Sequence, residues 1–142
     1  MKILKKIPTF AFLLVAYDIL IVIGKADLLG RTLVRIKMMS GALWVMSLAD
    51  LFIILGLIFL FVEVIKSTRT SQAAILDHIL STLVFIIFLI EFIVVKGAGS
   101  SVFLILCLMS LFDVIAGFTV TITTARRDIT MDRNSGYIPP SS

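Results

Sequence analysis

The fold is decided by the stretch LADLFIILGLIFLFVEVIK at residues 48–66, which is apolar along almost its whole length. A helix that crosses the ~30 Å hydrocarbon core of a membrane needs about 20 mostly apolar residues. Three further runs are of comparable length, at 7–24, 74–95 and 102–123. Because a helix satisfies its own backbone hydrogen bonds, which lipid cannot do, the sequence predicts an all-α membrane protein, a bundle of four transmembrane helices.

The composition agrees with this prediction. Hydrophobic residues make up 60% of the 142 residues, more than a soluble domain of this size could bury in its own core. The first run follows three lysines, as in a signal peptide, but it is long and carries Asp18, so we expect an uncleaved first helix. Residues 1–125 would then form one transmembrane domain, followed by a polar cytoplasmic tail at 126–142.

Basic residues indicate how the bundle is oriented, because they favour the cytoplasmic side of a membrane. With four crossings, the side that holds both termini and the 67–73 loop carries eight of them: Lys2, Lys5, Lys6, Lys66, Arg69, Arg126, Arg127 and Arg133. The opposite side carries five: Lys25, Arg31, Arg35, Lys37 and Lys96. The excess predicts a multi-pass protein of the bacterial inner (plasma) membrane with both termini in the cytoplasm. The net charge of +4 then reflects topology and contact with anionic lipids, and no nucleic-acid motif accompanies it.

The segment 25–47 is the longest stretch outside the four runs. Residues 33–38, LVRIKM, alternate apolar and basic side chains, which is the period of a strand. Ser40-Gly41 follows as a turn signal, and an apolar stretch resumes at 42–46. The pattern favours a short outer β-hairpin, with an interfacial helix or a loop as the alternative. In either case we expect Trp44 to anchor the segment at the level of the lipid headgroups.

Polar residues mark several helix starts. Ser47-Leu48-Ala49-Asp50 matches a capping box, which places the start of the second helix there. Thr70 or Ser71 is expected to cap the third helix, and Ser100 or Ser101 the fourth.

The tail at 126–142 has a different character. It is polar and contains Pro139 and Pro140, a composition typical of disordered segments. Arg126 and Arg127, at its start, are candidates for docking anionic lipid or a soluble partner.

Acidic and basic residues are segregated along the chain. The basic residues lie outside the four runs or at their ends, whereas six of the nine acidic residues lie within them. These six are Asp18, Asp50, Glu63, Asp77, Glu91 and Asp113. An ionised group at the bilayer centre costs roughly 2.5–3.5 kcal/mol. Such residues therefore face protein or water, and each raises a functional question.

Position along each run sorts these acids by depth, at a rise of about 1.5 Å per residue. Asp50 lies in a first turn, where it is expected to act as a cap. Glu91 lies toward the outer side, close in sequence to Lys96, and is expected to pair with a basic loop residue.

An inner layer is formed by Glu63, Asp77 and His78, close in sequence to Lys66 and Arg69. The simpler interpretation of this layer is an interfacial network of salt bridges.

Asp18 and Asp113 both fall near the midplane and have no basic residue within one helical turn. One interpretation is that each is neutral and hydrogen-bonded between helices, joining the bundle. The other is a functional pair. The faces around them favour an inward location, because the fourth run carries a stripe of small and polar residues at the helical period. That stripe is Ser110, Asp113, Gly117 and Thr121, and the third run carries Asp77, Ser81, Val84, Phe88, Glu91 and Val95 on one face.

Motifs for catalysis or for cofactor and metal binding are missing from the sequence. It contains no paired histidines, no Cys-x-x-Cys and no glycine-rich phosphate loop. His78 is the single histidine, and neither an oxyanion hole nor a nucleophile elbow accompanies the nearby Ser81. The lone Cys107 is interpreted as a packing residue. We expect no enzyme activity, no cofactor and no metal.

Four short segments together resemble a known group of proteins: Ser40-Gly41-Ala42-Leu43-Trp44, Glu63-Val64-Ile65-Lys66-Ser67-Thr68-Arg69, Asp77-His78-x-Leu80-Ser81-Thr82 and Thr124-Ala125-Arg126-Arg127-Asp128. They resemble small four-helix bacterial inner-membrane proteins without an assigned activity. The resemblance implies the location and the topology, and it supplies no catalytic residues.

Two functions follow as hypotheses. The first is a non-enzymatic subunit or scaffold of a larger inner-membrane assembly, bound to other membrane-protein subunits or to copies of itself, and to membrane lipids. The alternative is a small proton-coupled transporter that uses midplane carboxylates, with Asp18 or Asp113 as the switch.

Overall fold

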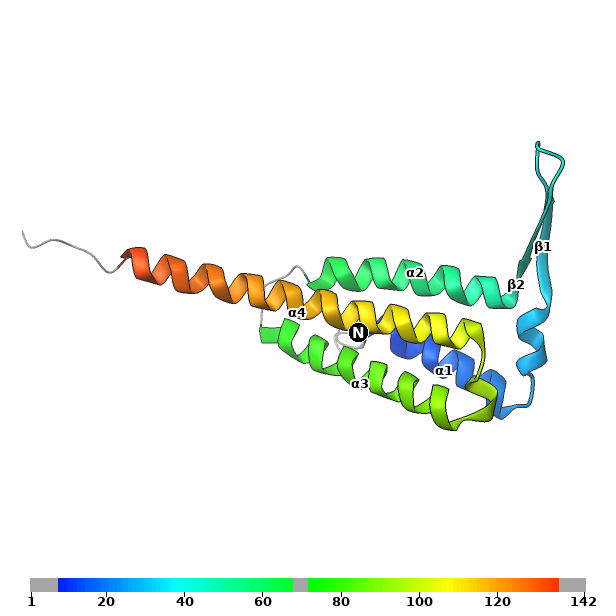
Figure 1. The fold of residues 1–142 in the computed structure, drawn as a ribbon, viewed down its shortest axis with the longest axis horizontal. Coiled ribbons are helices and arrows are strands. Elements are labelled where there is room, and N and C mark those ends of the chain that lie inside the picture. Colours follow the sequence, from blue (N-terminus) through cyan, green and yellow to red (C-terminus); the bar gives the residue numbers. More distant parts are fainter. Residues whose placement is uncertain (1–7, 68–71, 136–142) are drawn as a thin grey trace, which may run out of the picture.

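The computed structural model describes residues 8–67 and 72–135 of the chain. Within these residues four α-helices lie side by side in a bundle (Figure 1). They are α1 (Thr9–Val22), α2 (Leu48–Ser67), α3 (Gln72–Val94) and α4 (Ser101–Ser135). Three of them, α2, α3 and the Ser101–Thr123 part of α4, contain segments long and apolar enough to cross a membrane. The predicted helical bundle is thus confirmed, with three helices that are long and apolar enough to cross a membrane.

The first helix is shorter than predicted. α1 has 14 residues, or about 21 Å at 1.5 Å per residue, and a fourth span is not shown. It begins after Pro8 and ends at a glycine cap: Gly24 has φ +66°, and the Lys25 N–H donates to the Leu20 carbonyl at 2.9 Å. This closing bond is that of a Schellman motif, in which glycine adopts the left-handed conformation at low cost.

α4 is the central helix of the bundle. It packs most extensively against α2 and α3, while α1 packs against α2 and α3 from the other side (Figure 1). We call the end of the bundle formed by residues 23–47 and 95–100 the hairpin end, and the opposite end, where α2 finishes and α3 begins, the tail end.

The predicted β-hairpin is confirmed. After a short 3-10 helix, η2 (Ala26–Gly30), strand β1 (Thr32–Lys37) pairs antiparallel with β2 (Leu43–Ser47). The turn uses Gly41 at φ +85°, a left-handed conformation that favours glycine. The Gly41 N–H donates to the Met38 carbonyl at 2.9 Å, and the Met38 N–H donates to the Ala42 carbonyl at 2.8 Å.

Two predicted caps are also found. Asp50 accepts hydrogen bonds from the Ser47 N–H at 2.8 Å and the Ser47 hydroxyl at 2.7 Å, and its own N–H donates to Ser47 Oγ at 3.2 Å. Ser100 caps α4, since its Oγ accepts a hydrogen bond from the Phe103 N–H at 3.1 Å. The predicted caps of the third helix, Thr70 and Ser71, lie outside the described residues.

Four aromatic rings, one from each helix, form the core toward the hairpin end: Tyr17, Phe52, Phe88 and Phe103. We call them the aromatic layer. The Tyr17 ring lies 5.6 Å from Phe52 and 4.8 Å from Phe103, and Phe103 lies 5.2 Å from Phe88. Tyr17 is fully buried, and its hydroxyl is hydrogen-bonded to Ser100 Oγ at 2.7 Å.

The fourth helix continues well past its predicted end at residue 123. α4 runs to Ser135 and extends beyond the tail end of the bundle (Figure 1). The start of the predicted polar tail, 126–135, is therefore helical, although its composition is typical of disorder. Residues 136–142, with Pro139 and Pro140, lie outside the described residues.

Candidate functional site

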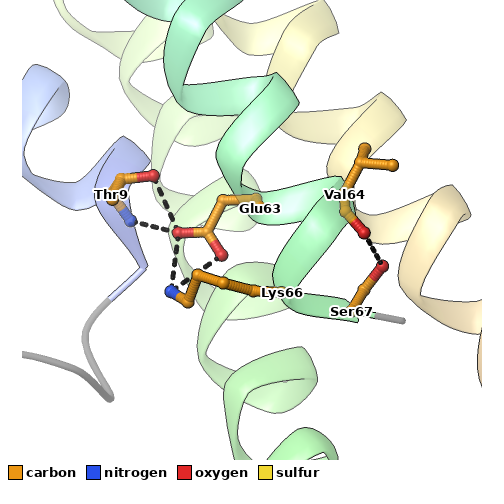
Figure 2. Close-up of polar contacts among 5 residues, drawn as sticks. All are labelled: Thr9, Glu63, Val64, Lys66 and Ser67. Atoms are coloured by element: carbon orange, nitrogen blue, oxygen red, sulfur yellow. Dashed lines mark hydrogen bonds and ion pairs between the residues drawn. The ribbon is translucent and has the colours of Figure 1, made fainter. Parts of the chain in front are cut away.

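The tail end of the bundle contains a buried carboxylate at Glu63, near the end of α2. Its side chain is 4% exposed. Figure 2 shows that one oxygen accepts hydrogen bonds from the backbone N–H and the hydroxyl of Thr9 on α1, the latter at 2.8 Å. Lys66, one turn later, forms a salt bridge with the other oxygen at 3.0 Å (Figure 2). Glu63 therefore joins α1 to α2 while its charge is matched within its own helix.

Asp113 lies at the same end, on the inner face of α4. It is 5% exposed and hydrogen-bonded to the hydroxyl of Ser81 on α3, and it interacts electrostatically with Glu63 and Lys66. Ser81 and the neighbouring Ser110 are buried as well. Of the predicted polar stripe of α4, Ser110, Asp113 and Gly117 face the interior of the bundle, where Asp113 links α4 to α3, whereas Thr121 is exposed.

His78 packs against the same stretch of α4. Its ring meets Phe118 edge-on, with the centroids 4.0 Å apart. A Cβ at Gly117 would overlap His78 Nδ1, so the glycine is what lets the imidazole approach α4. Nε2 of His78 is buried and has no hydrogen-bond partner among the described residues.

A small cavity of about 30 Å³ lies among these side chains. Its lining includes the six residues that we call the polar cluster, together with Ser67, Gly117 and Thr121. The polar cluster is Glu63, Lys66, Asp77, His78, Ser81 and Asp113. The predicted inner layer of Glu63, Asp77, His78 and Lys66 is thus brought together, whereas Arg69 lies outside the described residues. The volume suits one or two water molecules. In residues 8–67 and 72–135 no three His, Cys, Asp or Glu side chains are placed so that they could hold one metal ion.

Asp18 and Asp113 were expected near the midplane, with a functional pair as one interpretation. In the structure they interact with different residues. Asp18 on α1 interacts with Glu91 on α3, carboxyl to carboxyl. Glu91 was expected to pair with a basic loop residue such as Lys96, and it meets an acid instead. The sequence shows how deep a residue lies along its helix, but it does not show which neighbouring helix the side chain faces. The partner of Glu91 could therefore not be predicted.

The remaining candidates lie at the two ends of the molecule. Trp44 is on β2 and is 42% exposed. Arg126 is exposed on the continuation of α4, and Arg127 follows it in the same helix, with a side chain outside the described part of the chain.

Several residues that shape the site were not singled out from the sequence. Thr9 supplies two donors to Glu63, and Tyr17 ties α1 to the start of α4. The threonine follows a proline at the beginning of an apolar run, which is a signal for a helix start and gives no indication of a distant partner.

Comparison of the chain with models of known protein families, with characterised proteins and with solved structures finds no match. The resemblance to small four-helix bacterial inner-membrane proteins therefore remains an expectation from the quoted segments.

Proposed function

We propose that this chain is a non-enzymatic subunit or scaffold of a larger assembly in a bacterial inner membrane. In this proposal four helices cross the membrane, both termini are cytoplasmic, and anionic lipids surround the bundle. Partners bind through the part of α4 that continues beyond the tail end.

The contacts of α1 support the fourth crossing. Near its start, Thr9 is hydrogen-bonded to Glu63, about one turn from the end of α2. Toward its end, Tyr17 is hydrogen-bonded to Ser100 just before α4 begins. α1 thus reaches from the tail end to the hairpin end against neighbours that are long enough to span. Its 14 residues cover about 21 Å, and local thinning of the bilayer can accommodate the remaining mismatch.

The continuation of α4 is the observation that carries the proposal. The helix has 35 residues, about 52 Å at 1.5 Å per residue, whereas the hydrocarbon core is about 30 Å thick. Its last part, 124–135, reads TARRDITMDRNS, with charges of both signs. An isolated helix as short as 124–135 is marginally stable in water. A polar helix that projects from a bundle is well suited to bridging to another protein.

Several of the acids have partners inside the bundle, whereas Glu91 Oε2 is buried without a hydrogen-bond partner among the described residues. Within the described residues Asp113 is hydrogen-bonded to Ser81, Glu63 to Thr9 and Lys66, and Asp18 interacts with Glu91. Substitution of Asp113 by leucine should therefore loosen the bundle itself, and assembly should depend on the α4 continuation.

The test is the native mass of the protein extracted together with its lipid, with every co-purifying chain identified. We expect stoichiometric partner chains with the full-length protein and their loss from a variant truncated after Thr123. The matched control is Arg35→Gln/Lys37→Gln, which removes two charges at the other end and should keep the partners. A full-length protein that runs alone would contradict the proposal, and a truncated chain that keeps its partners would exclude this docking site.

A second candidate is a proton-coupled transporter, and the observation that favours it is the cavity in the polar cluster, lined by Asp113 and His78. This proposal predicts that Asp113→Asn abolishes proton-linked flux in liposomes. Asp50→Asn, which alters an exposed acid at the hairpin end, serves as the control and should leave the flux intact. Wild-type protein without flux for any cation tested would remove the transporter from consideration.

A further inference from the structure

The hairpin has two chemically different faces, which follow from its register. Cross-strand partners lie on the same face of a sheet, and neighbours along a strand alternate between faces. Val34 pairs with Met46 and Ile36 with Trp44, so these four residues form one wholly apolar face. Arg35 pairs with Val45 and Lys37 with Leu43, which places both cations on the opposite face.

The apolar face is open in the monomer. Val34 is 37% exposed, Ile36 48% and Trp44 42%. A two-stranded hairpin that stands alone in water is marginally stable at best. A surface that covers this face would therefore stabilise the hairpin.

The position of the hairpin limits what can cover it. It projects across the long axis of the bundle and reaches sideways past α2 (Figure 1). β2 joins α2 with no linker, at the Ser47–Asp50 capping box. Since the apolar segment of α2 begins at Leu48, a bilayer around α2 would have its headgroup layer at the level of the hairpin, and the hairpin would overhang the lipid beside α2.

The charges of this segment match such a location. Arg31, Arg35 and Lys37 are all exposed, and each basic residue near an anionic surface strengthens binding. The indole of tryptophan favours the boundary between headgroups and acyl chains. An apolar face with cations opposite is the arrangement of amphipathic helices that lie in the membrane interface. The hairpin has the same arrangement, with Val45 and Leu43 beside the cations.

We propose that the hairpin is a lipid-binding element that lies flat in the headgroup layer. Val34, Ile36, Trp44 and Met46 contact the upper acyl chains, and Arg35 and Lys37, with Arg31, bind the phosphates of anionic phospholipids. The proposal rests on the bundle lying in a bilayer and is independent of what binds to α4. The proposal also explains why Arg31, Arg35 and Lys37 lie on the predicted outer side of the membrane, which carries fewer basic residues than the cytoplasmic side.

Trp44 is the single tryptophan of the chain, so its fluorescence reports on the hairpin without any substitution. The full chain is reconstituted in vesicles that contain phosphatidylglycerol and phosphatidylcholine. We expect strong quenching by lipids brominated near the headgroup end of the acyl chain, weaker quenching by lipids brominated near the chain terminus, and little quenching by aqueous acrylamide. Efficient acrylamide quenching without bromolipid quenching would place the hairpin in water and overturn the proposal. Protection from both quenchers would mean that protein covers Trp44, which overturns it equally.

The role of the cations is tested with the same signal. In the wild type, brominated phosphatidylglycerol should quench Trp44 more than brominated phosphatidylcholine does at equal content. In Arg35→Gln/Lys37→Gln this preference should fall to parity while the depth of Trp44 is unchanged. Arg126→Gln/Arg127→Gln removes two charges at the opposite end and should retain the preference. A preference that survives loss of the hairpin cations would contradict their assignment to phosphate.

Discussion

The two ends of the bundle are held together by different means. Toward the hairpin end, the aromatic layer brings one ring from each helix into contact, with centroids 4.8–5.6 Å apart. Toward the tail end, Glu63 joins α2 to α1 through Thr9, and Asp113 joins α4 to α3 through Ser81, around a cavity of about 30 Å³. Lys66 matches the charge of Glu63 within α2. Lipid tails are as apolar as the side chains themselves, so little hydrophobic force drives helices together in a membrane. Shape complementarity therefore holds one end, and polar pairing holds the other.

The largest effect should come from loss of volume in the aromatic layer. Phe103 is fully buried between Tyr17 and Phe88, and Phe103→Ala should lower the free energy of unfolding by about 3–5 kcal/mol because it leaves a cavity. The measurement is unfolding of the helical circular dichroism in micelles of increasing dodecyl sulfate content. Phe112, on the same helix but 58% exposed, is the control, and Phe112→Ala should change little. Equal losses for the two variants would mean that the layer is not a packed core.

At the tail end, pairing matters more than volume. Glu63→Leu fills similar space but removes the acceptor of the Thr9 donors and the partner of Lys66. We expect a loss of roughly 2–3 kcal/mol, since unsatisfied buried donors cost about 1–3 kcal/mol.

Glu63→Gln is the matched control, because its carbonyl still accepts from Thr9 while the charge is removed. It should lose less than half as much in the same unfolding measurement. If glutamine and leucine were equally damaging, the salt bridge with Lys66 would be the main contribution and the bond to α1 a minor one.

Much of this arrangement is readable from the sequence. The alternation at 33–38 and the Ser40-Gly41 turn predicted the hairpin, and Ser47-Leu48-Ala49-Asp50 predicted the start of α2, because turns and caps depend on neighbouring residues only. The inward stripe of α4 was also predicted, since polar residues in a membrane must face protein or water.

The aromatic layer and the acid partners were not predicted. The chain has 11 phenylalanines, and in a membrane both the lipid face and the core face of a helix are apolar, so periodicity does not separate Phe103 from Phe112. Asp18 and Asp113 were assigned similar depths, and depth does not say which helix lies opposite. The sequence analysis did not predict that α4 continues past residue 123. The polar composition of this segment is typical of disorder, and local sequence gives only a weak indication that a helix continues.

In the polar cluster the imidazole of His78 lies directly against α4 at Gly117. Gly117→Ala should cost about 1–2 kcal/mol, as overpacking does, because the new Cβ overlaps the His78 ring. Gly56→Ala is the comparison: its Cβ would meet Leu106 Cδ2 at 2.8 Å and Met109 Sδ at 2.9 Å, the ends of flexible side chains that can move aside. It should therefore cost less. Combining Gly117→Ala with His78→Ala should recover most of the loss in unfolding free energy, and additive losses would show that the imidazole is not what the glycine accommodates.

The smallest effect tests the one polar link within the aromatic layer. Tyr17→Phe keeps the ring and removes only the hydrogen bond to Ser100, which is 2.7 Å long, so it should cost about 0.6 kcal/mol, the average for such bonds in membranes. Ser100→Ala should cost more, because Ser100 also caps α4 through the Phe103 N–H. In the Ser100→Ala background, Tyr17→Phe should have no further effect on unfolding. If Tyr17→Phe alone were as damaging as Phe103→Ala, the hairpin end would depend on a hydrogen bond as the tail end does, and the contrast between the two ends would be lost.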